Sequence, residues 1–372
     1  MKYSWKEKSL DKIIDFKNGK KRPPEEGCIP VYGGNGILSY TNNSNYSNCV
    51  IVGRVGAYCG SIYYEKGDCW VSDNAIVATA KEGNDIRFIY YLLISLQLNK
   101  SQIGTGQPLL TQGILNSITT IVPEYGTQKK IANVLYLIDL KIKNNNDINN
   151  NLEQQTQAIF KSWFVDFELN YGIMPSDWKV SQLGSIAKIS TEVFSPAKNQ
   201  NVEVEHYSIP AYDEKCYPVF ETSNGIKSNK YRLSSNSVMI SKLNPDTKRI
   251  WRPYCISDNP ICSTEFIVYE PINPLNRDFI YSIIDSIGFS AFLCSHTTGS
   301  TNSRQRATPS ITLTYDIVVP DEKTIRAFCS IVSPMYDTIE NNIKENQKLA
   351  ETRDKLLPKL MSGELDVSDF DL

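Results

Sequence analysis

The stretch IANVLYLIDLKIKNNNDINNNLEQQTQAIFKSWF, residues 131–164, decides the fold, because its seam positions recur in alternating steps of four and three. That spacing is the heptad signature of a helix packed along a partner helix. The same spacing returns in residues 328–360, which predicts a second helix of the same kind. The apolar positions predicted for the two helix seams are Ile131, Leu135, Ile138, Ile142, Leu152, Ile159, Phe328, Val332, Met335, Ile339, Leu349 and Leu356.

Two such helices, each of roughly 60 Å at 1.5 Å per residue, are too polar outside to be core and too long to be stable alone. We expect them to pack antiparallel and to serve as spacers. Asparagines at matching seam positions, such as Asn145 and Asn342, are expected to fix their register. An ordinary helical hairpin or an oligomerisation coil is the alternative interpretation.

An internal repeat organises the rest of the chain. Trp5, Leu10 and Ile13 return 173 residues later as a W-x4-L-x2-I phrase, whereas the two copies keep a constant offset of 197 residues after Pro123. Short β-rich runs separated by Gly, Asn and Pro turns fill the segment before each long helix, so we predict an α+β fold with a pseudo-twofold internal repeat. The predicted segments are a first recognition domain (1–124), a central helix (125–170), a second recognition domain (171–321), a C-terminal helix (322–364) and a tail (365–372).

Composition narrows the class of protein. A chain of 372 residues with 41% hydrophobic and 22% charged residues suits two globular domains, and it contains no run of eighteen apolar residues. We therefore expect no membrane association, and a cytoplasmic location because the N-terminal residues show no secretion signal. The nine cysteines form no CxxC pair and the chain has two histidines, so no metal site is predicted.

The charge distribution suggests local rather than global nucleic-acid binding. The formal net charge is −2, but residues 2–22 carry eight Lys or Arg against three acids, and residues 227–252 carry seven against one. Two similar domains at a fixed separation suit a ligand with two similar sites, and double-stranded DNA offers half-sites about 34 Å apart per helical turn. A solvated charged face is the alternative reading of each stretch.

The loops where the two copies diverge supply the candidate DNA contacts. In the first domain they are Lys20, Lys21, Arg22, Tyr32, Asn35, Arg54 and Gln107. In the second domain they are Lys242, Asn244, Lys248, Arg249, Arg252, Arg304, Gln305 and Arg306. Asparagine pairs well with adenine, and Lys or Arg with guanine or phosphate. An ordinary hairpin turn is the alternative for the Gly33–Gly36 segment.

Catalytic motifs are missing from the sequence. It has no Asn/Asp-Pro-Pro-aromatic tetrapeptide of an amino-methyltransferase, no glycine-rich cofactor turn and no P-loop. We therefore expect no catalytic residue and no cofactor in this chain. The acidic run after Pro320 sits at a strand-to-helix junction, which does not suit a nuclease centre.

Four stretches carry a family resemblance: RDKLLPKLMSGELDV (353–367), QTQAIFKSWFVDF (155–167), VYGGNG (31–36) and SDNAIV (72–77). With them the sequence resembles, over essentially its whole length, the specificity subunits of type I restriction-modification enzymes. The helix junctions PEYGTQKK (123–130) and PDEKTIRAF (320–328) depart from the usual pattern of that family. The resemblance implies two target-recognition domains that read a bipartite asymmetric DNA site. It also implies two docked modification subunits that methylate adenine with S-adenosylmethionine, and restriction subunits that use ATP and Mg²⁺ as further candidate partners.

Two rival hypotheses remain open at this point. One is a stand-alone nuclease or methyltransferase with an unrecognised site, and the other is a coiled-coil adaptor that binds only proteins. The missing motifs disfavour the first, and the second leaves the divergent basic loops unexplained.

Overall fold

The computed structural model describes residues 5–100, 108–298 and 305–367, and the chain packs into two compact units. The first unit comprises Met1–Ile142 and Lys348–Leu372, and the second comprises Lys143–Gln347. Both combine sheets with helices, which confirms the α+β expectation. The packing divides each long helix between the two units, whereas the sequence-based segments treated the helices as separate spacers.

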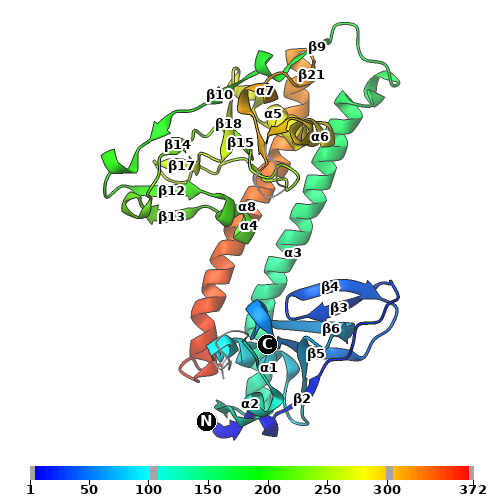
Figure 1. The fold of residues 1–372 in the computed structure, drawn as a ribbon, viewed down its shortest axis with the longest axis vertical. Coiled ribbons are helices and arrows are strands. Elements are labelled where there is room, and N and C mark those ends of the chain that lie inside the picture. Colours follow the sequence, from blue (N-terminus) through cyan, green and yellow to red (C-terminus); the bar gives the residue numbers. More distant parts are fainter. Residues whose placement is uncertain (1–4, 101–107, 299–304, 368–372) are drawn as a thin grey trace. The chain divides into compact units, whose positions relative to one another are not determined.

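The first unit is built on a six-stranded sheet in the order β2-β7-β5-β6-β3-β4 (Figure 1). A short antiparallel pair, β1 with β8, joins its beginning to its end. The Asp85 side chain accepts hydrogen bonds from the first amides of α1, which fixes where that helix begins. The elements are β1 (Lys6–Ser9), β2 (Ile14–Asn18), β3 (Ile29–Gly33), β4 (Gly36–Thr41), β5 (Tyr46–Gly53), β6 (Ile62–Val71), β7 (Ala75–Ala80), α1 (Ile86–Ser95), α2 (Gln112–Ser117) and β8 (Thr119–Val122).

The second unit contains a four-stranded sheet, β10-β18-β15-β16, and a five-stranded sheet, β11-β14-β17-β12-β13. The pairs β21–β9 and β19–β20 complete it. The elements are β9 (Lys179–Gln182), β10 (Ala187–Ser190), β11 (Val193–Phe194), β12 (Glu203–Tyr207), α4 (Ile209–Lys215), β13 (Val219–Thr222), β14 (Lys230–Arg232), β15 (Val238–Ser241), β16 (Ile250–Trp251), β17 (Pro260–Ser263), β18 (Phe266–Pro271), α5 (Arg277–Asp285), α6 (Ile287–Ser295), β19 (Thr297–Thr298), β20 (Arg306–Ala307), α7 (Pro309–Thr312) and β21 (Asp316–Val319).

Corresponding elements of the two units lie at the offsets seen in the sequence. Strand β9 follows β1 by 173 residues, β18 follows β7 by 191, and β21 follows β8 by 197. Strand β3 runs parallel to β6, and β12 runs parallel to β17 in the same way. Tyr32 pairs with Val71 in the first unit and Tyr207 with Cys262 in the second, so the two tyrosines correspond.

The two long helices have 40 residues each: α3 spans Tyr125–Phe164 and α8 spans Glu322–Met361. Their ends differ by 197 residues at both termini. Helix α8 continues through Pro334 and Pro358, although an internal proline removes a helix hydrogen bond. Beside the first, the Thr338 hydroxyl donates to the Pro334 carbonyl at 2.8 Å.

Each long helix contributes one segment to the core of the first unit and another to the core of the second. In the first unit, Ile131 and Leu135 of α3 pack with Leu360 and Met361 of α8 and with Phe88 of α1. Five predicted seam positions, Ile131, Leu135, Phe328, Val332 and Ile339, are buried. The other seven are half-buried: Ile138, Ile142, Leu152, Ile159, Met335, Leu349 and Leu356.

The corresponding core positions of the second unit are aromatic. Phe328, Phe160, Phe164 and Phe279 stand where the first unit has Ile131, Leu357, Met361 and Phe88. The Phe164 and Phe328 ring centroids are 5.0 Å apart, and those of Phe164 and Phe279 are 5.1 Å apart. The two cores therefore use the same positions, with different side chains at three of the four and phenylalanine at the fourth.

Asparagines line the seam inside the second unit. Asn145 donates to Asn346 at 2.9 Å and Asn342 donates to Asn149 at 2.8 Å. Asn145 is 1% exposed and Asn149 is 6% exposed, so the bonds lie inside the helix pair. A buried amide without its partner is costly, and paired asparagines therefore favour this register over shifted ones.

No single helix among the described residues is long and apolar enough to cross a membrane. The bent pair Pro274–Asp285 and Ile287–Ser295 meets the criteria of length and composition together. Phe279, Ile280 and Phe289 of this pair are buried in the core of the second unit.

Candidate nucleic-acid interface

In the first unit, four predicted DNA contacts gather around residues 72–75, between β6 and β7. Lys20 forms a bridge with Ser72, and the Tyr32 carbonyl accepts from the Ser72 amide at 2.8 Å. The Arg54 amide donates to the Asn74 carbonyl at 3.1 Å. Asn35 lies in the turn between β3 and β4. The fold thus brings segments that are far apart in the sequence together beside the loop that joins β6 to β7.

Glycines allow this close approach. A side chain at Gly19 would meet the Ser72 carbonyl oxygen at 1.9 Å, and one at Gly53 would meet the Tyr58 carbonyl oxygen at 2.2 Å. The Ser61 hydroxyl donates to the Gly34 carbonyl at 2.5 Å, which ties the glycine turn to the loop after β5. Residue types without a Cβ are therefore required where the backbones meet.

The candidate side chains beside this loop differ in exposure. Lys20, Lys21, Arg22 and Asn35 are exposed, as DNA contacts require. Tyr32 is 7% exposed, and its hydroxyl donates to Glu65 at 2.9 Å. Burial and this hydrogen bond raise the pKa of Tyr32. Tyr32 is therefore placed to support the turn from within the sheet.

In the second unit, Lys242, Asn244, Gln305 and Arg306 come together. The Asn244 amide donates to the Gln305 carbonyl at 2.9 Å, and Leu243 bridges to Arg306. Arg306 forms a two-pronged ion pair with Glu265 at 3.0 and 3.2 Å. In this cluster Lys242 directly follows β15, just as Arg54 of the first unit directly follows β5.

Lys248 and Arg249 are engaged within the second unit. Lys248 Nζ lies 2.5 Å from Asp285 Oδ1, and Arg249 binds both oxygens of Asp213 at 2.6 and 2.8 Å. Asp213 lies on α4, so Arg249 holds that helix against the loop before β16. The structure thus gives both cations a role in the fold that the basic composition alone did not reveal.

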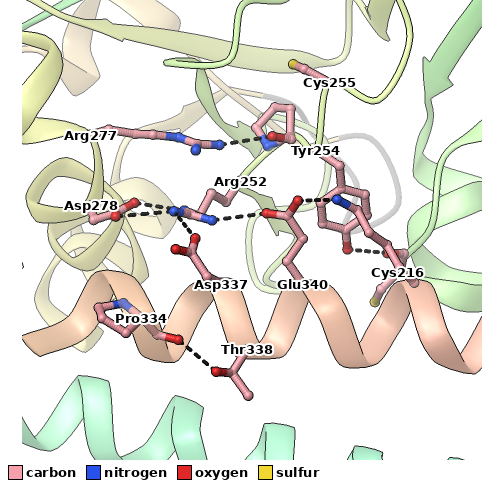
Figure 2. A network of polar contacts seen from close by, with 12 residues as sticks. Cys216, Arg252, Tyr254, Cys255, Arg277, Asp278, Pro334, Asp337, Thr338 and Glu340 are labelled. Carbon is pink, nitrogen blue, oxygen red and sulfur yellow. Dashed lines mark hydrogen bonds and ion pairs between the residues drawn. The ribbon is translucent and has the colours of Figure 1, made fainter.

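Arg252 is the centre of a buried ion network (Figure 2). Its guanidinium contacts Asp278 at 2.8 Å, Asp337 at 2.8 Å and Glu340 at 3.1 Å. Its side chain is 13% exposed. Burial disfavours the charge on Arg252, but the ion pairs outweigh it and raise the pKa. Its nitrogens are therefore occupied, and we leave Arg252 out of the proposed DNA contacts.

Two further candidates, Gln107 and Arg304, lie outside the described residues. They precede the segments that bridge to Val55 and Leu243 respectively. Their assignment as DNA contacts remains a prediction.

The two units differ in the segment that follows β3 in the first and β12 in the second. The first unit has the short Gly33–Gly36 turn, and the second has α4 in the corresponding place. Sequence comparison missed α4 as a candidate recognition element, because its residues align with no counterpart in the first copy. The unmatched length was the signal that could have indicated it.

Strand β12 carries a histidine, His206, whose ionisation affects stability. His206 Nδ1 is 2.7 Å from Glu221 Oε1, and burial lowers the pKa of His206 below its ordinary 6.5 although Glu221 opposes this. Neutral His206 therefore stabilises the fold above pH 6.5, and this contribution is lost as the pH falls through the folded-state pKa.

We expect His206→Gln to flatten the fall in stability between pH 7.5 and 5.5, measured by urea unfolding. His296 is exposed, and His296→Gln is the matched control that should keep the wild-type slope. Equal slopes in all three proteins would contradict this role of His206.

Among the described residues, no group of three or more His, Cys, Asp or Glu side chains is arranged to hold a metal ion. A pocket of about 760 Å³ in the second unit is lined by residues of α3, α5 and the β21 region, among them Phe160, Phe164 and Ile317.

Comparisons with known proteins point to a class of DNA-specificity proteins. Residues 3–154 match the family described as the type I restriction modification DNA specificity domain. This match confirms the resemblance found in the sequence, and the relatives described next are type I restriction enzyme specificity subunits.

Similar proteins are named as specificity subunits of type I restriction enzymes. The MjaIX specificity subunit of Methanocaldococcus jannaschii is 26% identical over 78% of this chain and 71% of its own length. The HindI specificity subunit of Haemophilus influenzae is 24% identical over 75% of this chain and 77% of its own. The crystal structure of a type I S subunit from M. genitalium shares the fold, with a TM-score of 0.67, 17% identity and 96% coverage of both chains.

Proposed function

We propose that this chain is the non-catalytic specificity subunit of a type I restriction-modification complex and reads a bipartite, asymmetric DNA site. The match of residues 3–154 to a DNA specificity domain carries the proposal. The exposed Lys20, Lys21, Arg22 and Asn35, gathered at one edge of the first unit, support it. The second unit offers a group of different side chains, Lys242, Asn244, Gln305 and Arg306. Two different groups are what an asymmetric DNA site requires.

We further propose that two adenine methyltransferase subunits dock on this chain, and that restriction subunits are additional partners. S-adenosylmethionine would then be bound by the methyltransferases, and ATP and Mg²⁺ by the restriction subunits. The expected location is the cytoplasm, where such a complex meets chromosomal DNA.

The test is to map methylated adenines by long-read sequencing in a host that expresses the chain with its neighbouring methyltransferase. A bipartite motif with a fixed gap that disappears when this gene is deleted is the expected result. Methylation that persists after deletion would contradict the proposal. Methylation by the purified chain alone would instead favour the stand-alone enzyme.

A further inference from the structure

We propose that Arg54 and Lys242 occupy the same place in the two units and contact the DNA backbone phosphates beside each half-site. This inference rests on the proposed function. It separates these two cations, as sequence-independent positioning contacts, from the residues that read bases.

The strand registers establish the correspondence. In the first unit Gly53, the last residue of β5, pairs with Ala75 of β7, and in the second unit Ser241, the last residue of β15, pairs with Phe266 of β18. Arg54 and Lys242 each follow directly. The pairing is antiparallel and keeps the same register over four residue pairs in both units.

The backbone hydrogen bonds of the two residues are also the same. The Arg54 amide donates to Asn74 at 3.1 Å, and the Lys242 amide donates to the corresponding Glu265 at 2.9 Å. The Arg54 carbonyl accepts from Leu110 at 2.9 Å, and the Lys242 carbonyl accepts from Ala307 at 2.9 Å. Each cation is therefore held between the same two neighbouring segments.

Two residues after each cation, the backbone of both units adopts the left-handed conformation. Gly56 has φ +74° and its amide donates to Pro108 at 3.1 Å; Asn244 has φ +48° and its amide donates to Gln305 at 2.9 Å. Glycine and asparagine are the residues that tolerate this conformation best. The motif cation–apolar–left-handed residue is thus present in both units with one backbone geometry.

The charges of these two residues are not used by the fold. Within residues 5–100, 108–298 and 305–367, no ion pair is found for Arg54 or Lys242. By contrast Lys248, Arg249, Arg252 and Arg306 all have carboxylate partners. Arg54 Nε is moreover buried without a hydrogen-bond partner among the described residues.

Both units have a cation at this position although their other candidate contacts differ. This points to a contact with phosphate rather than with a base. Domains that read different sequences need different base-reading side chains, whereas phosphates are the same in every sequence. The position keeps a cation in both units, while the left-handed position beside it changes from Gly56 to Asn244. The geometry therefore assigns the cation to the common part of the ligand.

The experiment uses the full chain co-expressed with its methyltransferase and a labelled duplex that carries the mapped motif. We expect Arg54→Gln and Lys242→Gln each to weaken binding about tenfold at roughly 0.1 M salt, and to reduce the slope of log K against log salt by about 0.9. The charge-conserving variants Arg54→Lys and Lys242→Arg should keep the wild-type slope. Arg326→Gln, which removes an exposed cation on α8, is the matched control and should leave binding unchanged.

The methylation motif distinguishes the possible roles. An unchanged motif with a reduced salt slope supports the phosphate contact. A motif relaxed in one half-site would show base reading and overturn the inference, as would unaltered slopes in both Gln variants. If the wild-type complex fails to distinguish the motif from a scrambled duplex, the proposed function itself fails, and this inference fails with it.

Discussion

Replacing Arg252 with methionine is expected to lower the free energy of unfolding of the second unit by about 3–5 kcal/mol. The substitution keeps much of the apolar stem but leaves Asp278, 8% exposed, without its cation. Glu340, 17% exposed, keeps only its pair with Lys344. Breaking one side of a buried ion network is costly because the remaining charges stay desolvated. Urea unfolding followed by tryptophan fluorescence measures the effect, since Trp163, Trp178 and Trp251 all lie in this unit.

The matched control for Arg252→Met is Arg326→Met on α8, the helix that carries Asp337 and Glu340. Arg326 and Glu322 are 62% and 59% exposed, so their pair should contribute at most about 0.5 kcal/mol. Equal losses in the two variants would contradict the structural role assigned to Arg252. A loss of DNA affinity without any loss of stability would return Arg252 to the DNA contacts predicted from sequence.

Phe328→Ala is expected to destabilise the second unit by about 3–5 kcal/mol through the cavity that it leaves. The Phe328 ring is fully buried and lies within 6.1 Å, centroid to centroid, of Phe160, Phe164 and Phe279. Hydrogen exchange should show faster opening of α5 and of the α8 residues near Phe328.

Phe328→Leu provides the matched comparison, because leucine refills part of the space and resembles Ile131 at the corresponding position of the first unit. It should cost clearly less than the alanine variant. Equal destabilisation by alanine and leucine would contradict a cavity as the cause.

The long helices could be predicted from the sequence because heptad spacing is a local signal. The predicted segments 125–170 and 322–364 contain helices that end at Phe164 and Met361. The predicted seam also contained polar residues, and the structure pairs its asparagines with one another. The division of each helix between two cores could not be predicted, because it depends on contacts with distant strands and helices.

The basic stretch at 227–252 shows why the candidate site was harder to predict. Sequence reveals that Arg249 and Arg252 are charged but does not reveal partners 26 to 88 residues away, such as Asp213, Asp278 and Glu340. Arg54 and Lys242, by contrast, could be chosen as candidate contacts because each lies at the end of a strand-like run, VIVGRV (50–55) and SVMISKL (237–243). Their role as DNA contacts stays a prediction. Their equivalence became evident only from the shared backbone hydrogen bonds.

Aligned positions of the two units can also form different kinds of side-chain contact, which the sequence does not show. In the first unit Tyr91 donates to Asp139 at 2.6 Å, and Arg353 contacts the other oxygen at 2.8 Å. The second unit has Ser282 and Tyr336 at the places of Tyr91 and Asp139, with their hydroxyls 2.9 Å apart. A charged contact and a neutral one thus fill the same place, and neither was evident from the aligned residues.

The most direct test of DNA reading is the affinity of the chain, bound to its methyltransferase, for a duplex with the mapped motif and for one with both half-sites scrambled. Fluorescence anisotropy at about 0.15 M salt should give a ratio of at least about 10³ in favour of the motif, as for other specific DNA-binding proteins. Equal affinity for the two duplexes would contradict the account.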